Sequence, residues 1–275
     1  MILRTKILPK TISDGAVTIF TLFIVPVVYW FELFVVMPTF YSMWSAWYTF
    51  HFVMGTFIFV NISSNYAAVV LSDTSIKGRF LPTTRQPNWH FCAVCESLVP
   101  PRSWHCSVCN ICILKRDHHC MFTSCCIGHH NQRYFLMFVL YVFIACCYAT
   151  VYNALFMWTR FDFSSFISLF KVVFPLLMLI FDYSYNQIYL FLSLILFIIG
   201  IFTGALLCYH INLVFQGTVT YEYNKNVREY DLGCKLNVIS VLGERWYLVW
   251  TSPFTESKLP SDGIVWFKKD SVKAK

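Results

Sequence analysis

Long apolar stretches alternate with polar ones along the chain, and each apolar stretch approaches the length of a membrane crossing. A transmembrane helix needs about 20 consecutive, mainly apolar residues. The first such stretch covers residues 17–37, with Glu32 as its single charged residue, and the following Pro38 predicts the end of the helix. A second, aromatic-rich stretch covers residues 40–60. Residues 17–60 are therefore predicted to form the first two transmembrane helices, after a polar and basic arm over residues 1–16.

The second half of the chain repeats this pattern with one ambiguity. Residues 134–158 and 186–215 are strongly apolar and predict a third and a last transmembrane helix. The stretch between them, residues 159–185, is apolar but interrupted by several serines, Lys171 and Pro175. It predicts a hydrophobic hairpin on the luminal side, with a fifth span as the alternative.

Composition and charge support an integral membrane protein with both ends in the cytosol. The 275 residues are 57% hydrophobic and 13% charged, whereas soluble domains carry about 25% charged residues. Of the 21 basic residues, three lie in residues 1–16, seven in the loop 61–133 and nine in the tail 216–275. Basic residues collect on the cytosolic side of a membrane. These segments are therefore expected in the cytosol, which favours four crossings over five.

The central loop carries a dense block of metal-binding residue types. Eight of the 12 cysteines fall between residues 92 and 126. A disulfide framework would be spread more evenly through a small secreted chain, whereas repeated C-x2-C spacings are typical of zinc sites. The candidate ligands are Cys92, Cys95, Cys106, Cys109, Cys112, Cys120, Cys125, Cys126, His90, His105, His118 and His119. Two tetrahedral zinc sites would leave four of these over, and one zinc site with a loose remainder is the simpler alternative.

One continuous pattern runs through this block and beyond it, from Cys92 to Phe135. It reads C-x2-C-x6-R-x2-H-C-x2-C-x2-C-x4-D-H-H-C-x5-C-x4-N-x3-F over about 45 residues. This pattern resembles the cysteine-rich domain of the DHHC-type protein S-acyltransferases, or palmitoyltransferases. Further on, Thr220-Tyr221-Glu222 resembles the end of the family's TTxE motif, and Asn237 lies in a stretch that resembles its C-terminal motif.

The resemblance implies a fold and a set of ligands. The fold is an α-helical integral membrane protein with four transmembrane helices and a cytosolic, two-zinc cysteine-rich domain between the second and third. The first structural zinc ion would be held by Cys92, Cys95, His105 and Cys112. The second would be held by Cys106, Cys109, His119 and Cys126. His90, His118, Cys120 and Cys125 are then left over.

The tetrad Asp117-His118-His119-Cys120 would carry the chemistry that the resemblance implies. A thiolate rather than a thiol attacks a thioester, and a neighbouring imidazole can take the thiol proton. A carboxylate can fix the tautomer and orientation of that imidazole. We therefore expect Cys120 to be the nucleophile, His118 the base and Asp117 the group that orients it. The acyl group would pass from acyl-CoA to Cys120 and then to a protein cysteine, in a ping-pong reaction.

The resemblance also implies supporting residues, partners and a location. Thr220 would hydrogen-bond near Asp117, Asn237 would tie the tail to the last helix, and Asn131 would anchor the metal-binding block to the third helix. Expected partners are acyl-CoA, proteins with membrane-proximal cysteines and the lipid bilayer, with no nucleic acid. We expect an endomembrane location, in the endoplasmic reticulum or Golgi, with the cysteine-rich domain facing the cytosol.

The sequence departs from the family's pattern in two places. Met121-Phe122 follow the tetrad where the family usually has Pro-Trp, and Val219 replaces the first threonine of TTxE. Neither change removes a chemical group from the tetrad. The alternative function is a catalytically weak or inactive zinc-binding scaffold or adaptor in the membrane, but an intact tetrad favours the enzyme.

Overall fold

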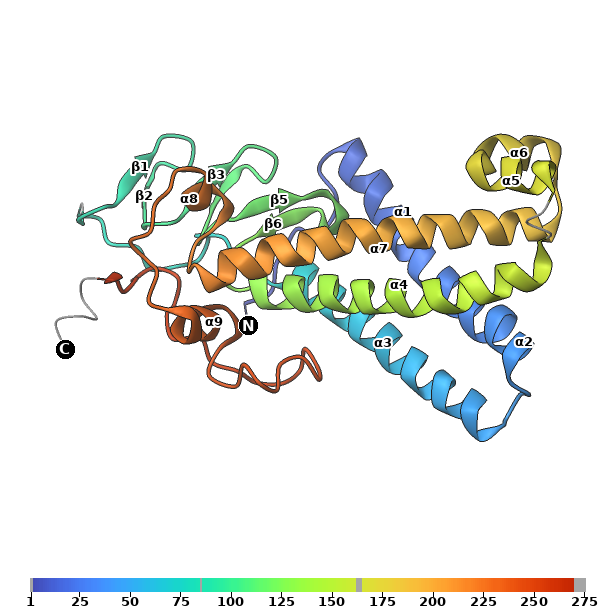
Figure 1. Ribbon diagram of the computed structural model, residues 1–275. Helices are drawn as coiled ribbons and strands as arrows, with labels where there is room; N and C mark the ends of the chain where they lie inside the picture. The colour runs from blue at the N-terminus through green and yellow to red at the C-terminus, as the bar shows by residue number, and fades with distance from the viewer. Residues whose placement is uncertain (1, 85, 162–164, 270–275) are drawn as a thin grey trace. The chain divides into compact units, whose positions relative to one another are not determined.

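The computed structural model describes residues 2–84, 86–161 and 165–269, and this part of the chain is mostly helical (Figure 1). Four of its helices are long and apolar enough to cross a membrane, which confirms the predicted fold class. They are Ile12–Phe40, α3 (Ala46–Leu71), α4 (Gln132–Arg160) and α7 (Tyr185–Phe215). The first consists of α1 (Ile12–Phe31), a π-helical stretch (Glu32–Val36) and α2 (Met37–Phe40).

The first helix continues through Pro38, where we predicted its end. Proline lacks the N–H that a helix needs at each position, and its ring crowds the carbonyl four residues earlier. Just before Pro38 the helix widens, and the Met37 N–H donates to the carbonyl of Glu32, five residues earlier. Such π-helical bulges are a known way for a helix to accommodate a local irregularity. The helix therefore ends at Phe40 instead of residue 37.

The second helix also differs from its predicted range of 40–60. It begins at Ala46 and continues to Leu71, through polar residues that resemble a loop in sequence. Two of these, Asn61 and Asn65, are buried, and the Asn65 Nδ2 donates to the Asn61 carbonyl oxygen at 2.9 Å. This bond within the helix gives the buried Asn65 Nδ2 an acceptor.

The chain divides into two compact units, which we describe separately. The helical unit comprises Ile24–Val60 and Val139–Leu207. The hairpin unit comprises the described residues of Met1–Phe23, Asn61–Phe138 and Cys208–Lys275.

Apolar side chains of several helices form the core of the helical unit. One cluster contains Phe31, Val36, Phe156, Met157 and Leu190, all buried. Glu32 is buried as well, and its Oε1 accepts a hydrogen bond of 2.8 Å from the Asn153 side chain on α4. The single charged residue of the first apolar stretch therefore faces another helix within this unit.

Residues 159–185 contain two short helices, α5 (Phe166–Val173) and α6 (Pro175–Phe181) (Figure 1). With eight and seven residues, each is far shorter than the roughly 20 residues of a crossing. Among the described residues of this stretch, no helix is long enough to form a fifth membrane span. Residues 162–164 of this stretch lie outside the described residues, as does Arg85 of the central loop. The luminal placement of the stretch stays a prediction.

Three small β-hairpins form the centre of the hairpin unit. They pair β1 (His90–Cys92) with β2 (Ser97–Val99), β3 (Trp104–Cys106) with β4 (Ile111–Ile113), and β5 (His118–Cys120) with β6 (Cys125–Ile127). Each strand has three residues, and an isolated two-stranded hairpin is at best marginally stable in water. These hairpins therefore need support from a cross-link, such as a bound metal ion, or from packing against other residues.

The described packing around the hairpins is modest and involves the candidate metal ligands themselves. One apolar cluster joins Cys92 and Cys112 to Ile76, Val99 and Leu114, and a smaller one contains Cys106, Ile113 and Cys126. Gly128 closes the block tightly, because a Cβ there would lie 2.6 Å from the Leu114 carbonyl oxygen. Two helices of the tail, α8 (Thr220–Asn224) and α9 (Cys234–Leu242), complete this unit.

Candidate active site and metal centres

The first candidate metal centre lies between two hairpins of the hairpin unit. Cys92, Cys95, His105 and Cys112 bring their ligand atoms within 4.8 Å of one another. Cys92 ends β1 and Cys95 lies in the turn after it, whereas His105 and Cys112 are partners across β3 and β4. The His105 Nδ1 faces all three sulfurs, at 3.8, 3.4 and 3.9 Å.

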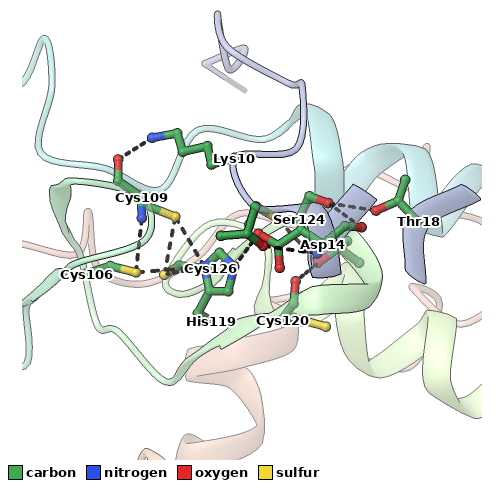
Figure 2. A network of polar contacts seen from close by, with 12 residues as sticks. Lys10, Asp14, Thr18, Cys106, Cys109, His119, Cys120, Ser124 and Cys126 are labelled. Atoms are coloured by element: carbon green, nitrogen blue, oxygen red, sulfur yellow. Dashed lines mark hydrogen bonds and ion pairs between the residues drawn. The ribbon is translucent and has the colours of Figure 1, made fainter. Parts of the chain in front are cut away.

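The second candidate centre has the same design one hairpin further along the chain. It brings together Cys106, Cys109, His119 and Cys126, again within 4.8 Å. His119 and Cys126 are partners across β5 and β6. The His119 Nδ1 faces the three sulfurs at 3.7, 3.4 and 3.8 Å, and Figure 2 shows these contacts.

Both clusters fit zinc in donor type and in size. Zn–S bonds of about 2.3 Å and Zn–N bonds of about 2.0 Å in a tetrahedron place donor atoms about 3.5–3.8 Å apart. The measured separations between each histidine nitrogen and its three sulfurs, 3.4–3.9 Å, have this size. Cys109 Sγ and Cys126 Sγ are 3.7 Å apart. The two sets of four are the sets that the sequence resemblance implied.

The remaining members of the tetrad lie beside the second cluster and outside it. Successive side chains of a strand point to opposite faces, so His119 and its neighbours on β5 face different ways. The His118 Nδ1 is 2.7 Å from the Asp117 Oδ2, and the His118 imidazole interacts with the Cys120 thiol closely enough to lower its pKa. Asp117, His118 and Cys120 therefore form one connected group.

The electrostatics of this group favour an ion pair between imidazole and thiol. Burial by itself would raise the pKa of Cys120, but the hydrogen bond and charge of His118 outweigh it and lower that pKa. Burial would lower the pKa of His118, but Asp117 and Cys120 raise it to about 9. Burial would raise the pKa of Asp117, but His118, His210 and the Thr220 backbone lower it to about 2.

Asp117 is held from three directions within the hairpin unit. Besides His118, the backbone N–H of Thr220 at the start of α8 donates to its Oδ1 at 2.6 Å. The Nδ1 of His210, near the end of α7, lies 3.5 Å from its Oδ2. The predicted contact of Thr220 is thus made by its backbone. His210, which no sequence motif indicated, also lies beside His118, with tilted rings whose centroids are 5.2 Å apart.

A buried ion pair connects the metal-binding block with the tail. The Arg102 guanidinium donates to both oxygens of Glu222, each at 2.7 Å, and both side chains are buried. The Cζ of Arg102 also lies 4.4 Å from the ring centroid of Tyr230 and 4.7 Å from that of Trp266. Glu222 in turn accepts a 3.0 Å bond from the backbone N–H of Val219. Because this bond comes from the backbone, the departure from threonine at position 219 leaves it intact.

The two asparagines singled out by sequence are both buried and fully engaged. The Asn131 side chain accepts from the Gly128 N–H at 2.8 Å and donates to the Cys126 carbonyl at 3.0 Å. Asn237 on α9 donates to the carbonyl of Phe215, the last residue of α7, at 2.9 Å. Asn131 therefore connects the residue before α4 with β6, and Asn237 connects α9 with the end of α7.

The four residues left over by the zinc sets have different surroundings. His90 stacks on Trp104, with ring centroids 4.9 Å apart, outside either cluster. Cys125 is buried and is the strand partner of Cys120, and its Sγ lies 3.4 Å from the Thr123 hydroxyl. Of these four, only His118 contacts Asp117 in the described part of the chain.

Comparison with known proteins shows the family of the chain. The sequence model of the DHHC palmitoyltransferase family matches residues 85–227, slightly more than half of the sequence. The chain belongs to the DHHC palmitoyltransferase family. It is 37% identical over 226 residues to the probable palmitoyltransferase ZDHHC24 of Danio rerio, covering 80% of this chain and 77% of that relative. It is 35% identical over 224 residues to the probable palmitoyltransferase ZDHHC24 of Homo sapiens, covering 77% and 76%.

Membership of the DHHC family confirms two expectations from the sequence. The protein is a protein S-acyltransferase, and with four membrane-competent helices it is a multi-pass membrane protein. A more distant relative, the palmitoyltransferase ZDHHC22 of Rattus norvegicus, is 27% identical over 72% of this chain and 74% of its own length. The two Cys/His clusters lie within the matched DHHC domain and are compatible with zinc binding.

Proposed function

We propose that this protein transfers a palmitoyl or similar long-chain acyl group from acyl-CoA to cysteine thiols of proteins, through an acyl-Cys120 intermediate. The connected group of Asp117, His118 and Cys120 carries this proposal. It joins a thiol of lowered pKa to an imidazole of raised pKa, with a carboxylate 2.7 Å from that imidazole. A Cys–His pair oriented by a third group is the general design of an activated nucleophile.

The reaction would proceed in two balanced steps. The Cys120 thiolate attacks the thioester carbonyl of acyl-CoA, the bond to the CoA sulfur breaks, and the departing thiolate takes the proton that His118 holds. A protein thiol then gives its proton to His118 and attacks the acyl-Cys120 thioester, which returns Cys120 to its thiolate form. Asp117 keeps the imidazole in place through both steps. One thioester is exchanged for another, so catalysis consists mainly of orientation and proton transfer.

We further propose structural zinc in the two Cys/His clusters. The first set would be Cys92, Cys95, His105 and Cys112. The second set would be Cys106, Cys109, His119 and Cys126. Bound zinc would hold together strands of three residues that have little packing of their own. Asn131, Asn237 and Thr220 would support this block through the hydrogen bonds described above.

The proposed setting is an endomembrane, in the endoplasmic reticulum or Golgi, with the DHHC domain and both ends of the chain in the cytosol. The distribution of basic residues supports this orientation. The acyl chain would lie among the membrane helices, because each buried methylene contributes about 0.8 kcal/mol. Cysteines of protein substrates would then have to lie close to the membrane surface. Basic residues of the loop and tail could contact the CoA phosphates.

The test is acylation of the purified protein by a clickable palmitoyl-CoA. We expect a hydroxylamine-sensitive adduct on the wild-type protein and none on Cys120→Ser. Cys234→Ser is the matched control, because Cys234 is an exposed thiol at the start of α9, and it should label like the wild type. Equal labelling of wild type and Cys120→Ser would refute Cys120 as the nucleophile.

A further inference from the structure

The first turns of α1 contact the part of the hairpin unit that carries Cys120. Asp14 lies in the first turn of α1 and is only 2% exposed. Its Oδ2 is 3.3 Å from the Nε2 of His119, which Figure 2 shows as a dashed line. A carboxylate in the first turn of a helix is common because the helix dipole favours it. That explanation does not require burial against an imidazole more than 100 positions along the chain.

The two nitrogens of the His119 ring have separate partners. Nδ1 faces the sulfurs of Cys106, Cys109 and Cys126. Nε2 faces Asp14. An imidazole that binds a metal through one nitrogen usually donates its other N–H to a carboxylate or carbonyl, which fixes the tautomer and the ring orientation. The arrangement at His119 is of this type.

The other cluster provides an internal comparison. His105 also turns its Nδ1 to three sulfurs, but its Nε2 makes no protein hydrogen bond within the described part of the chain. The carboxylate contact therefore distinguishes the cluster that contains His119, the neighbour of Cys120, from the cluster that contains His105.

A second group of contacts ties α1 to the other side of Cys120. The Ser124 hydroxyl donates to the Asp14 carbonyl oxygen at 3.3 Å and lies 2.6 Å from the Thr18 hydroxyl. Arg4, in the arm before α1, donates to the Ser124 carbonyl oxygen at 2.9 Å. Figure 2 shows Asp14, Thr18 and Ser124 together beside Cys120. The residue before Cys120 and the residue four positions after it are thus both held by the N-terminal part of the chain.

We propose that Asp14 is a positioning residue for the nucleophile Cys120. Asp14 acts by orienting the His119 ring toward the second zinc centre. The proposal rests on the proposed function, in that it takes His119 to be a zinc ligand. Asp14 contacts no reacting atom. It fixes the imidazole that precedes Cys120 on β5, and through it the position of the strand. The N-terminal arm is thereby part of the machinery that presents Cys120.

The test measures zinc release from detergent-solubilised, full-length protein with a colorimetric chelator. Loss of an outer carboxylate partner typically lowers metal affinity about 10–100-fold. We expect Asp14→Ala to release one of two zinc ions at least 10-fold faster than wild type, while the other leaves at the wild-type rate. Asp14→Asn keeps an acceptor oxygen without the charge and should be intermediate. Formation of acyl-Cys120 should slow in the same order.

Thr11→Ala is the matched control. The Thr11 hydroxyl accepts the Asp14 backbone N–H at 3.0 Å, so this variant loosens the start of α1 and keeps the carboxylate. It should release both zinc ions like the wild type. Wild-type release from both Asp14 variants would overturn the proposal, and so would faster release of both ions from Thr11→Ala and Asp14→Ala alike. A wild-type protein without zinc would instead refute the metal assignment of the proposed function, and the role of Asp14 with it.

Discussion

Asp117 joins parts of the chain that are far apart in sequence. Its two oxygens face His118, His210 and the backbone N–H of Thr220. A buried carboxylate without partners would be costly, and these contacts keep it charged, with a pKa of about 2. An ionised Asp117 in turn stabilises the protonated form of His118. The contact from α8 is therefore part of the electrostatics at Cys120.

Because Thr220 contributes its N–H and not its hydroxyl, two substitutions at this position should differ. Thr220→Val keeps the donor and should form acyl-Cys120 within about 3-fold of the wild-type rate. Thr220→Pro removes the donor, but proline suits the first position of a helix, and Val219 before it already has the extended conformation that proline requires. A hydrogen bond to a charged group contributes about 1.5–3 kcal/mol, so Thr220→Pro should slow acylation about 10–100-fold.

Single-turnover labelling of these two Thr220 variants with palmitoyl-CoA, at equal protein and zinc content, provides the measurement. A large loss in Thr220→Val would show that the hydroxyl acts, contrary to the structure. Wild-type rates in Thr220→Pro would show that the backbone contact does not matter.

At the scale of elements, the Arg102–Glu222 pair fastens α8 to the metal-binding block. Both side chains are buried, and Arg102 adopts a left-handed backbone conformation with φ of 66°. A buried ion pair is weak support for stability by itself, but removing one partner leaves the other charge buried and unpaired. The start of α8, which supplies the Thr220 N–H, depends on this pair through the bond from Val219 to Glu222.

We expect Glu222→Gln to destabilise the hairpin unit by about 3–5 kcal/mol, because Arg102 keeps its charge without a counter-ion. The matched control is Glu229→Gln. Glu229 pairs with Lys268 at 2.6 Å, but its side chain is 56% exposed, and surface pairs contribute about 0–1 kcal/mol. Denaturant unfolding followed through the tryptophans of this unit measures both. Equal effects of the two substitutions would contradict the importance given to the Arg102–Glu222 pair.

At the scale of the whole molecule, the two units depend on different forces. The helical unit is held by apolar contacts between long helices, as in the cluster around Phe31 and Phe156. The hairpin unit has three hairpins with strands of three residues, and the apolar clusters described around them are small. Zinc binding and folding are expected to be coupled in such a unit.

Removal of zinc by a strong chelator should therefore disrupt the hairpin unit and leave the helical unit largely intact. The far-ultraviolet signal of the long helices should remain largely unchanged. Residues 90–127 should become sensitive to limited proteolysis, and formation of acyl-Cys120 should fall below detection. Restoring two equivalents of zinc should reverse both changes. Full acylation activity in zinc-free protein would contradict a structural role for the metal.

The sequence predicts the fold well where one local signal dominates. The four membrane helices follow from the length of apolar stretches, and the grouping of metal ligands follows from spacing together with the family resemblance. The end of the first helix at Pro38 was wrong, because a π-helical stretch accommodates the proline. The contacts of Asp14 with His119 and of His210 with Asp117 were missed because about 90 or more positions of chain separate the partners in each pair. No local pattern reports such a contact.

The alternation of side chains along β5 has a consequence for how this protein can change in length. His119 faces the sulfurs of the second cluster, while His118 and Cys120 belong to the group that contains Asp117. Shifting the pairing of a strand by one residue moves its side chains to the opposite face. A single inserted or deleted residue between Cys120 and Cys125 that moved the pairing would turn either His119 or Cys126 away from the other members of the second cluster. The turn between β5 and β6 should therefore tolerate changes of residue, such as Met121-Phe122, far better than changes of length.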